Sequence, residues 1–175
     1  MINLLVVSMC SGQSGTQTWR KFTELVADFE LPTKDLRIIG EQEEISSADS
    51  LTYGNFFNDL KIEKKVRYQA AGDKIRCSVM IYFGTVDKDS LKVNSTRLME
   101  IVKEEFNPEI FQVKKAEIKE LGKNLRLTLS FISESQAGEI NFVTWIGNRF
   151  IIVTALEGLE SEIKYFHNNF KIKDN

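Results

Sequence analysis

The sequence of 175 residues is poor in the residue types on which several classes of protein depend. It contains one histidine, two cysteines and two prolines. A zinc site needs several His or Cys ligands at short spacing, and two cysteines do not make the disulfide framework of a small secreted domain. No Ser, Gly or Gln tract lies beyond residue 18, so the chain shows no linker or second domain. We therefore expect one domain without a metal or cofactor.

The chain also lacks an excess of either charge. It has 23 basic and 25 acidic residues and a formal net charge of −2. The two signs alternate within segments such as KIEKKVR and VKKAEIKELGK. A protein that binds nucleic acid needs Lys and Arg gathered on one face to neutralise phosphates. We therefore expect no nucleic-acid partner, and we interpret the mixed segments as solvated surface.

The N-terminal segment has no apolar run of the roughly 20 residues that span a membrane. Its short run, residues 4–7, is followed by Cys10 and by the polar stretch SGQSGTQT. This order resembles the end of a bacterial lipoprotein signal, although Met9 and the absence of Lys or Arg before the run depart from it. We expect residues 1–18 to be a signal remnant and tether, with Cys10 as the lipid attachment point in the cell envelope. The alternative is that residues 2–8 form a strand of a cytosolic protein.

Residues 19–175 are expected to form the single domain, and strict alternation identifies two of its strands. Apolar residues alternate with polar ones in IRCSVMIYF and in LRLTLSFI, as in strands with one buried face. The buried residues are then Ile75, Cys77, Val79, Ile81, Leu125, Leu127 and Leu129. Residues 64–83 are interpreted as a hairpin, and the last four strands as an antiparallel meander with Gly147 and Asn148 at its tight final turn.

Helices are predicted in four places, one of which is a short helix within residues 46–62 that Gly54 weakens. Apolar residues at helical spacing mark residues 87–108 and a closing helix with Ile163, Phe166 and Phe170 on one face. Residues 19–29 have steps of three and four that suggest a short helix, with residues 27–32 as an entering strand in the alternative interpretation. The predicted fold class is α+β, a mainly antiparallel β-sheet flanked by helices.

Few residues point to chemistry. His167, the single histidine, falls beside the apolar face of the closing helix and is interpreted as a surface residue. A Cys or Ser nucleophile needs a positioned base, and no such set can be assembled, so we expect no catalytic residues. Trp145, Asn148 and Arg149, at and beside the final hairpin tip, are the candidate binding surface. The partner is either a protein or a small ligand.

The tail GEINFVTWIGNRFIIVTALEGLESEIKYFHNNFKI adds a resemblance to this interpretation. It resembles the ending of the PsbP-like proteins, a family that includes a photosystem subunit, a Ran-binding relative and small bacterial lipoproteins. The resemblance covers roughly residues 64–172, and residues 19–62 depart from it. It implies an α/β/α sandwich and a non-catalytic accessory or binding module, here an envelope lipoprotein. The alternative is a cytosolic protein–protein adaptor.

Overall fold

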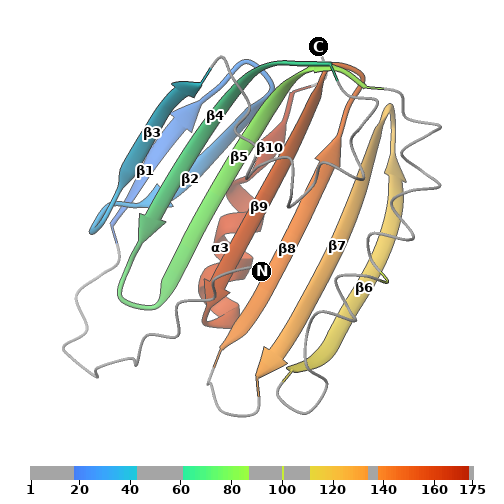
Figure 1. Cartoon of the computed structure of the whole chain (residues 1–175). Helices are drawn as coiled ribbons and strands as arrows, with labels where there is room; N and C mark the ends of the chain where they lie inside the picture. The colour runs from blue at the N-terminus through green and yellow to red at the C-terminus, as the bar shows by residue number, and fades with distance from the viewer. Residues whose placement is uncertain (1–17, 43–60, 87–99, 101–110, 134–137, 174–175) are drawn as a thin grey trace.

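The computed structural model describes residues 18–42, 61–86, 100, 111–133 and 138–173. The elements are β1 (Trp19–Thr23), β2 (Ala27–Pro32), β3 (Arg37–Gln42), β4 (Lys61–Ala71), β5 (Ile75–Thr85), β6 (Phe111–Leu121), β7 (Asn124–Ser133), β8 (Glu139–Ile146), β9 (Phe150–Gly158), α3 (Glu160–Asn169) and β10 (Lys171–Ile172). The strands form a seven-stranded sheet, in the order β3-β4-β5-β9-β8-β7-β6, and a three-stranded sheet, β1-β2-β10 (Figure 1).

The large sheet is antiparallel throughout, as the sequence predicts. β4 and β5 form the expected hairpin, and β6 to β9 form the expected meander. β5 also pairs with β9, where Val79 lies opposite Thr154. This pairing inserts the last strand of the meander beside the first hairpin, so that β9 lies at the centre of the sheet.

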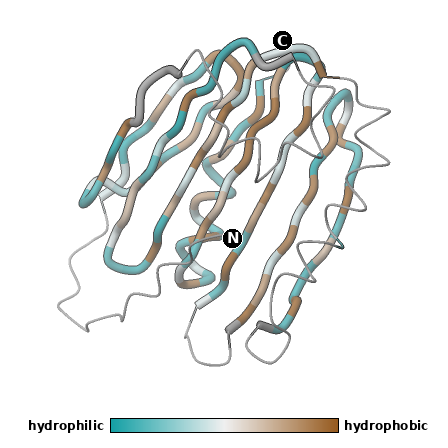
Figure 2. Tube along the Cα trace, in the orientation of Figure 1, coloured by the Kyte–Doolittle hydropathy of each residue, from teal (hydrophilic) through white to brown (hydrophobic). Residues whose placement is uncertain are grey.

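Both faces of the large sheet are buried along its central strands, whereas the described residues of the edge strand β6 are exposed or half-buried. The residues predicted to be buried are confirmed, since Ile75, Cys77, Val79, Ile81, Leu125, Leu127 and Leu129 expose 7% of their surface or less. Those of β5 belong to a core on the side of α3, and those of β7 to a second core on the opposite side. Hydrophobic and hydrophilic residues alternate along these strands (Figure 2).

An aromatic cluster joins α3 and the small sheet to the large sheet. The ring of Phe170, which follows α3, lies 5.9 Å from that of Phe29 in β2 and 5.5 Å from that of Phe166. Phe29 in turn contacts Phe22 and Tyr68, with ring centroids 5.6 and 5.2 Å away. The expected helical layer on this face is therefore shared between one helix and a small sheet.

The short helix suggested for residues 19–29 is wrong, because this segment is a hairpin. β1 pairs with β2 so that Phe22 lies directly opposite Phe29. The turn between β1 and β2 brings Phe22 and Phe29 to the same face of the hairpin. Their spacing in the sequence is therefore compatible with a helix, although no helix forms here. The alternative of an entering strand at residues 27–32 matches β2.

The closing helix is confirmed as α3, with Ile163 and Phe166 buried. The helix predicted for residues 87–108 and the possible strand at residues 2–8 lie outside the described residues, as does Cys10. No helix in the described part of the chain is long and apolar enough to cross a membrane.

Cys77 is a free cysteine in the core between β5 and α3. Burial, with a smaller contribution from Glu162, raises the pKa of its thiol to about 12. Because the thiolate is the reactive form of cysteine, Cys77 is a packing residue in the folded protein.

Gly158 at the end of β9 permits a close backbone contact. A Cβ at this position would lie 2.3 Å from the carbonyl oxygen of Lys74 and 2.8 Å from the Cα of Ile75. We expect Gly158→Ala to lower the free energy of unfolding by about 2 to 3 kcal/mol, because backbone atoms must move. Urea denaturation measures the loss.

Gly122→Asn is the matched control. Gly122 has a φ of +59° and no atom near its missing Cβ, and Asn tolerates this conformation. Equal stability of the Gly158→Ala variant and the control would contradict the close contact.

Candidate functional site

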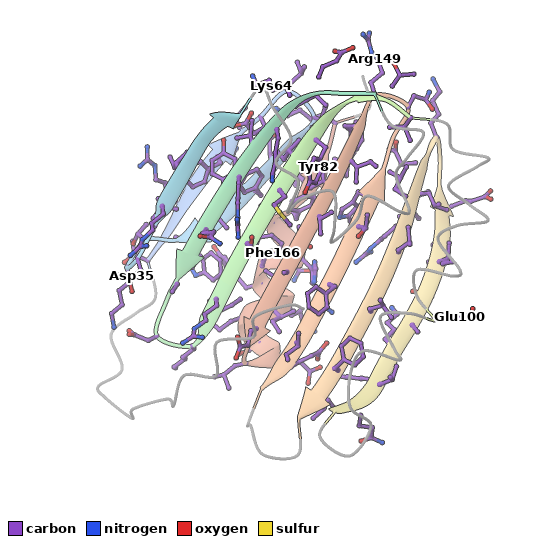
Figure 3. The ribbon with its side chains drawn as sticks, viewed as in Figure 1. Asp35, Lys64, Tyr82, Glu100, Arg149 and Phe166 are labelled. Atoms are coloured by element: carbon purple, nitrogen blue, oxygen red, sulfur yellow. The ribbon has the colours of Figure 1, made fainter. Side chains whose placement is uncertain are left out.

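A cleft of about 880 Å³ lies at one end of the large sheet. Its walls come from five places that are far apart in the sequence. They are the β1–β2 turn (residues 24–26), the paired ends of β4 and β5 (63–64 and 83–84), the β6–β7 turn (122–124), the β8–β9 tip (148–150) and Lys173. Figure 3 shows Lys64 and Arg149 at this end of the sheet and Asp35 at the other.

The β8–β9 tip consists of Asn148 and Arg149, one residue later than predicted. The register pairs Ile146 with Ile151, and the amide of Gly147 donates to the carbonyl of Phe150. A Cβ on Gly147 would lie 2.3 Å from the Phe150 ring. Glycine is therefore needed where this ring packs on the backbone, rather than at the tip itself.

Two hydrogen bonds fix the tip against β5. The amide of Gly84 donates to the carbonyl of Arg149 at 3.1 Å, and the amide of Val86 donates to that of Asn148 at 3.1 Å. Backbone bonds that hold a turn limit the orientations of its side chains. Asn148 and Arg149, both exposed, are therefore presented at the cleft from a fixed backbone.

Basic side chains outnumber acidic ones around the cleft. Lys64, Lys123, Arg149 and Lys173 line it, against Glu24 and Glu63. The hydroxyl of Tyr68 donates to the Glu24 carboxylate. Lys173 donates to the main-chain carbonyl of Glu24 at 2.7 Å and pairs with Asp28 at 2.9 Å. The acidic group of Glu24 and the basic group of Lys173 are thus already engaged at the base of the site.

The other basic groups lie among apolar side chains. The Lys64 ammonium lies 5.7 Å from the centre of the Phe83 ring. Phe150, Val26 and Leu25 also line the cleft, and Leu25 is 69% exposed. Among the described residues, the Arg149 guanidinium makes neither a hydrogen bond nor an ion pair. The site can therefore bind a negative group beside an apolar one.

Of the predicted surface residues, only Trp145 lies away from the cleft. Its ring stacks at 6.0 Å on that of Phe170, and the Arg126 guanidinium lies 4.6 Å from its centre. Trp145 therefore joins β8 to the core on the α3 side. Asn148 and Arg149 do lie together in the cleft.

The sequence interpretation missed the residues that complete the site. Phe83 and Lys64 lie at the ends of predicted strands, and Lys173 follows the closing helix. Nothing in their local sequence separates them from other strand-end residues. The β5–β9 pairing that gathers them connects segments about 70 residues apart.

His167 belongs to a polar network rather than to the solvated surface, so its interpretation as a surface residue is wrong. Its Nε2 lies 2.9 Å from Oδ1 of Asn141, which makes this nitrogen the donor. Asn141 Nδ2 donates to Glu139 at 3.3 Å, and Lys114 Nζ donates to Glu139 at 2.8 Å. Lys114 also lies 3.4 Å from Glu160. The network ties β6 and β8 to α3.

Among residues that the structure describes, no three His, Cys, Asp or Glu side chains are grouped so that they could hold a metal ion. His167 is remote from the cleft lining, and Cys77 is in the core. The described part of the cleft offers charge, hydrogen bonds and apolar contacts. These are means of binding.

Comparison with known proteins identifies the fold. The solution structure of cyanobacterial PsbP (CyanoP) from Synechocystis sp. PCC 6803 matches with a TM-score of 0.51 over 94% of this chain and 98% of that chain, at 12% identity. No protein-family model and no curated protein sequence matches the chain. The protein therefore has a PsbP-like fold, which confirms the predicted resemblance.

The half-buried His167 predicts a dependence of stability on pH. Burial, assisted by Arg126 and Lys115 and opposed by Glu139, lowers its pKa from 6.5 to about 4. Between these values the unfolded chain binds a proton that the folded chain does not. The free energy of unfolding therefore falls as the pH falls, by at most about 1.4 kcal/mol per pH unit from this residue.

We expect His167→Gln, which keeps a donor for Asn141, to remove this part of the dependence. Urea denaturation at pH 7 and at pH 5 measures how far the free energy of unfolding falls between the two pH values. This fall should be about 1 to 2 kcal/mol smaller in the variant than in the parent protein. An identical loss in both proteins would contradict a neutral, half-buried His167 in the folded protein.

Proposed function

We propose that the protein is a non-catalytic accessory module of PsbP type that binds through the cleft at the end of its large sheet. The observation that carries the proposal is the geometry of the cleft. Turns from both sheets meet there, and the β8–β9 tip presents the guanidinium of Arg149, which has no partner among the described residues, beside the apolar walls. The PsbP-like fold supports an accessory role by analogy of fold.

Site-specific photo-crosslinking tests whether this end of the sheet is a binding surface. We expect a photoreactive phenylalanine analogue in place of Asn148 to form an adduct in the native cell, because the side chain is exposed at the cleft. Mass spectrometry of the isolated protein identifies the adduct, whether it is a protein or a small molecule.

The matched control carries the same analogue in place of Asp73. This residue is also exposed in a tight turn, between β4 and β5, at the other end of the strands. Adducts at both positions in equal amount, or at Asp73 alone, would contradict binding at the cleft.

We further propose that the module is an envelope lipoprotein anchored at Cys10. Support comes from the order of an apolar run, Cys10 and a polar stretch before the domain. A lipid attached to Cys10 would hold the module at a membrane, and stable anchoring takes more than one lipid chain.

Substitution of Cys10 tests the anchor. Expressed from the full native gene, including any codons upstream of Met1, the parent protein should fractionate with membranes and carry the mass of attached lipid. Cys10→Ser should move most of the protein to the soluble fraction without changing its thermal stability, whereas Cys77→Ser should remain in the membrane fraction. A soluble, unlipidated parent chain that retains Met1 would favour the cytosolic adaptor.

A further inference from the structure

We infer that the cleft binds a small anionic amphiphile, with a carboxylate or phosphate head group near Arg149 and an apolar tail along Phe83 and Leu25. This inference rests on the proposed function and specifies the ligand of the same site. Three features of the cleft lead to it: its volume, its charge and the arrangement of its apolar residues.

The volume favours a small molecule over a macromolecule. Small-molecule sites in proteins typically enclose about 300 to 1,000 Å³, and the cleft measures about 880 Å³. A folded partner requires instead a surface of standard interface size. The cleft is hollowed between turns, as sites for small ligands are.

The charge of the lining favours an anion. Four basic and two acidic side chains give a formal charge of +2 around the cleft, whereas the whole chain has a net charge of −2. The Glu24 carboxylate is already hydrogen-bonded by Tyr68, which turns it toward the core. The described lining of the cleft therefore has a charge opposite in sign to that of the whole chain.

Arg149 is the group best suited to the head group. A guanidinium binds carboxylate or phosphate through two parallel hydrogen bonds. The Arg149 side chain makes no ion pair or hydrogen bond with any described residue, and its backbone is held by Gly84. An anion at this position would therefore gain a partner without displacing any of the described side chains.

The apolar lining accounts for the tail. Phe150 packs on Gly147, and the Phe83 ring lies under the Lys64 ammonium. Leu25, on the opposite rim, is the most exposed large apolar side chain of the described residues, at 69%. Phe150 is itself only 8% exposed, so the accessible apolar surface of the cleft belongs to Leu25 and to the half-buried Phe83. A simple anion would leave that surface in water, whereas an alkyl chain would cover it.

Four probes test the inference with the purified full-length protein: decanoate, decyl phosphate, decyltrimethylammonium and inorganic phosphate, each below the concentration at which micelles form. Calorimetry measures affinity, and amide NMR shifts locate the site. We expect at least one of the two anionic amphiphiles to bind about tenfold more tightly than both decyltrimethylammonium and inorganic phosphate. Amide shifts should centre on Gly84, Lys123 and Phe150. The tighter of decanoate and decyl phosphate identifies the head group.

Three variants locate the interactions. Arg149→Ala should weaken binding of the tighter anionic amphiphile about tenfold, with Arg149→Lys intermediate. Leu25→Ser should weaken binding of that amphiphile but not of inorganic phosphate. Lys34→Ala removes an exposed basic group at the other end of the sheet and should bind as the parent protein does. The NMR spectra also report whether each variant is folded.

Equal affinity for decyltrimethylammonium, or an Arg149→Ala affinity within about twofold of the parent value, would overturn the inference. Inorganic phosphate that binds as tightly as decyl phosphate would overturn the role of the tail. A protein adduct at position 148 together with no binding of either anionic amphiphile would reject this ligand while the binding module stands.

Discussion

The burial of both faces of the large sheet is the constraint on which the rest of the structure depends. β9 at its centre has Ile152 and Leu156 in the core on the α3 side, and Ile151 and Val153 in the core on the other side. A sheet with two apolar faces needs a cover on each of them. On one face α3 and the small sheet provide that cover, and Phe170 holds the two together through its contacts with Phe29 and Phe166.

The polar network around His167 and the cleft both lie where the cover formed by α3 and the small sheet ends. At the edge of α3, Asn141 of β8 meets His167 of the helix in a network that satisfies the buried amide. At the end of the sheet, the strands continue past the aromatic cluster into turns, and the cleft forms between them. The rigid cores thus position the turns, while the exposed turn residues Asn148 and Arg149 contribute little to either core.

The parts of the fold that could be predicted are those encoded locally. The alternation around Cys77 identified β5 and its buried face, because a half-buried strand repeats every second residue. The helical spacing of apolar residues in residues 19–29 gave a wrong prediction. The hairpin places Phe22 opposite Phe29, and two residues so placed can have the same spacing in the sequence as residues on one face of a helix. His167 was misjudged because its partner, Asn141, is 26 residues away on another element. Of the residues that line the cleft, only Asn148 and Arg149 could be predicted, because the signal for their turn lies in the neighbouring sequence. The β5–β9 pairing, which brings the other residues to the cleft, joins distant segments and has no such local signal.

The likeness to CyanoP extends over nearly the whole of both chains at 12% identity, so the two proteins share a backbone arrangement with few side chains in common. Packing rules account for such persistence, because a core tolerates many apolar substitutions that keep volume and pattern. A binding site has no such tolerance, since it depends on particular charges at particular turns. The function of this chain must therefore be argued from its own cleft. There, a glycine that admits the Phe150 ring and a tip held by the amides of Gly84 and Val86 place the Arg149 guanidinium, unpaired within the described part of the chain, beside an apolar wall.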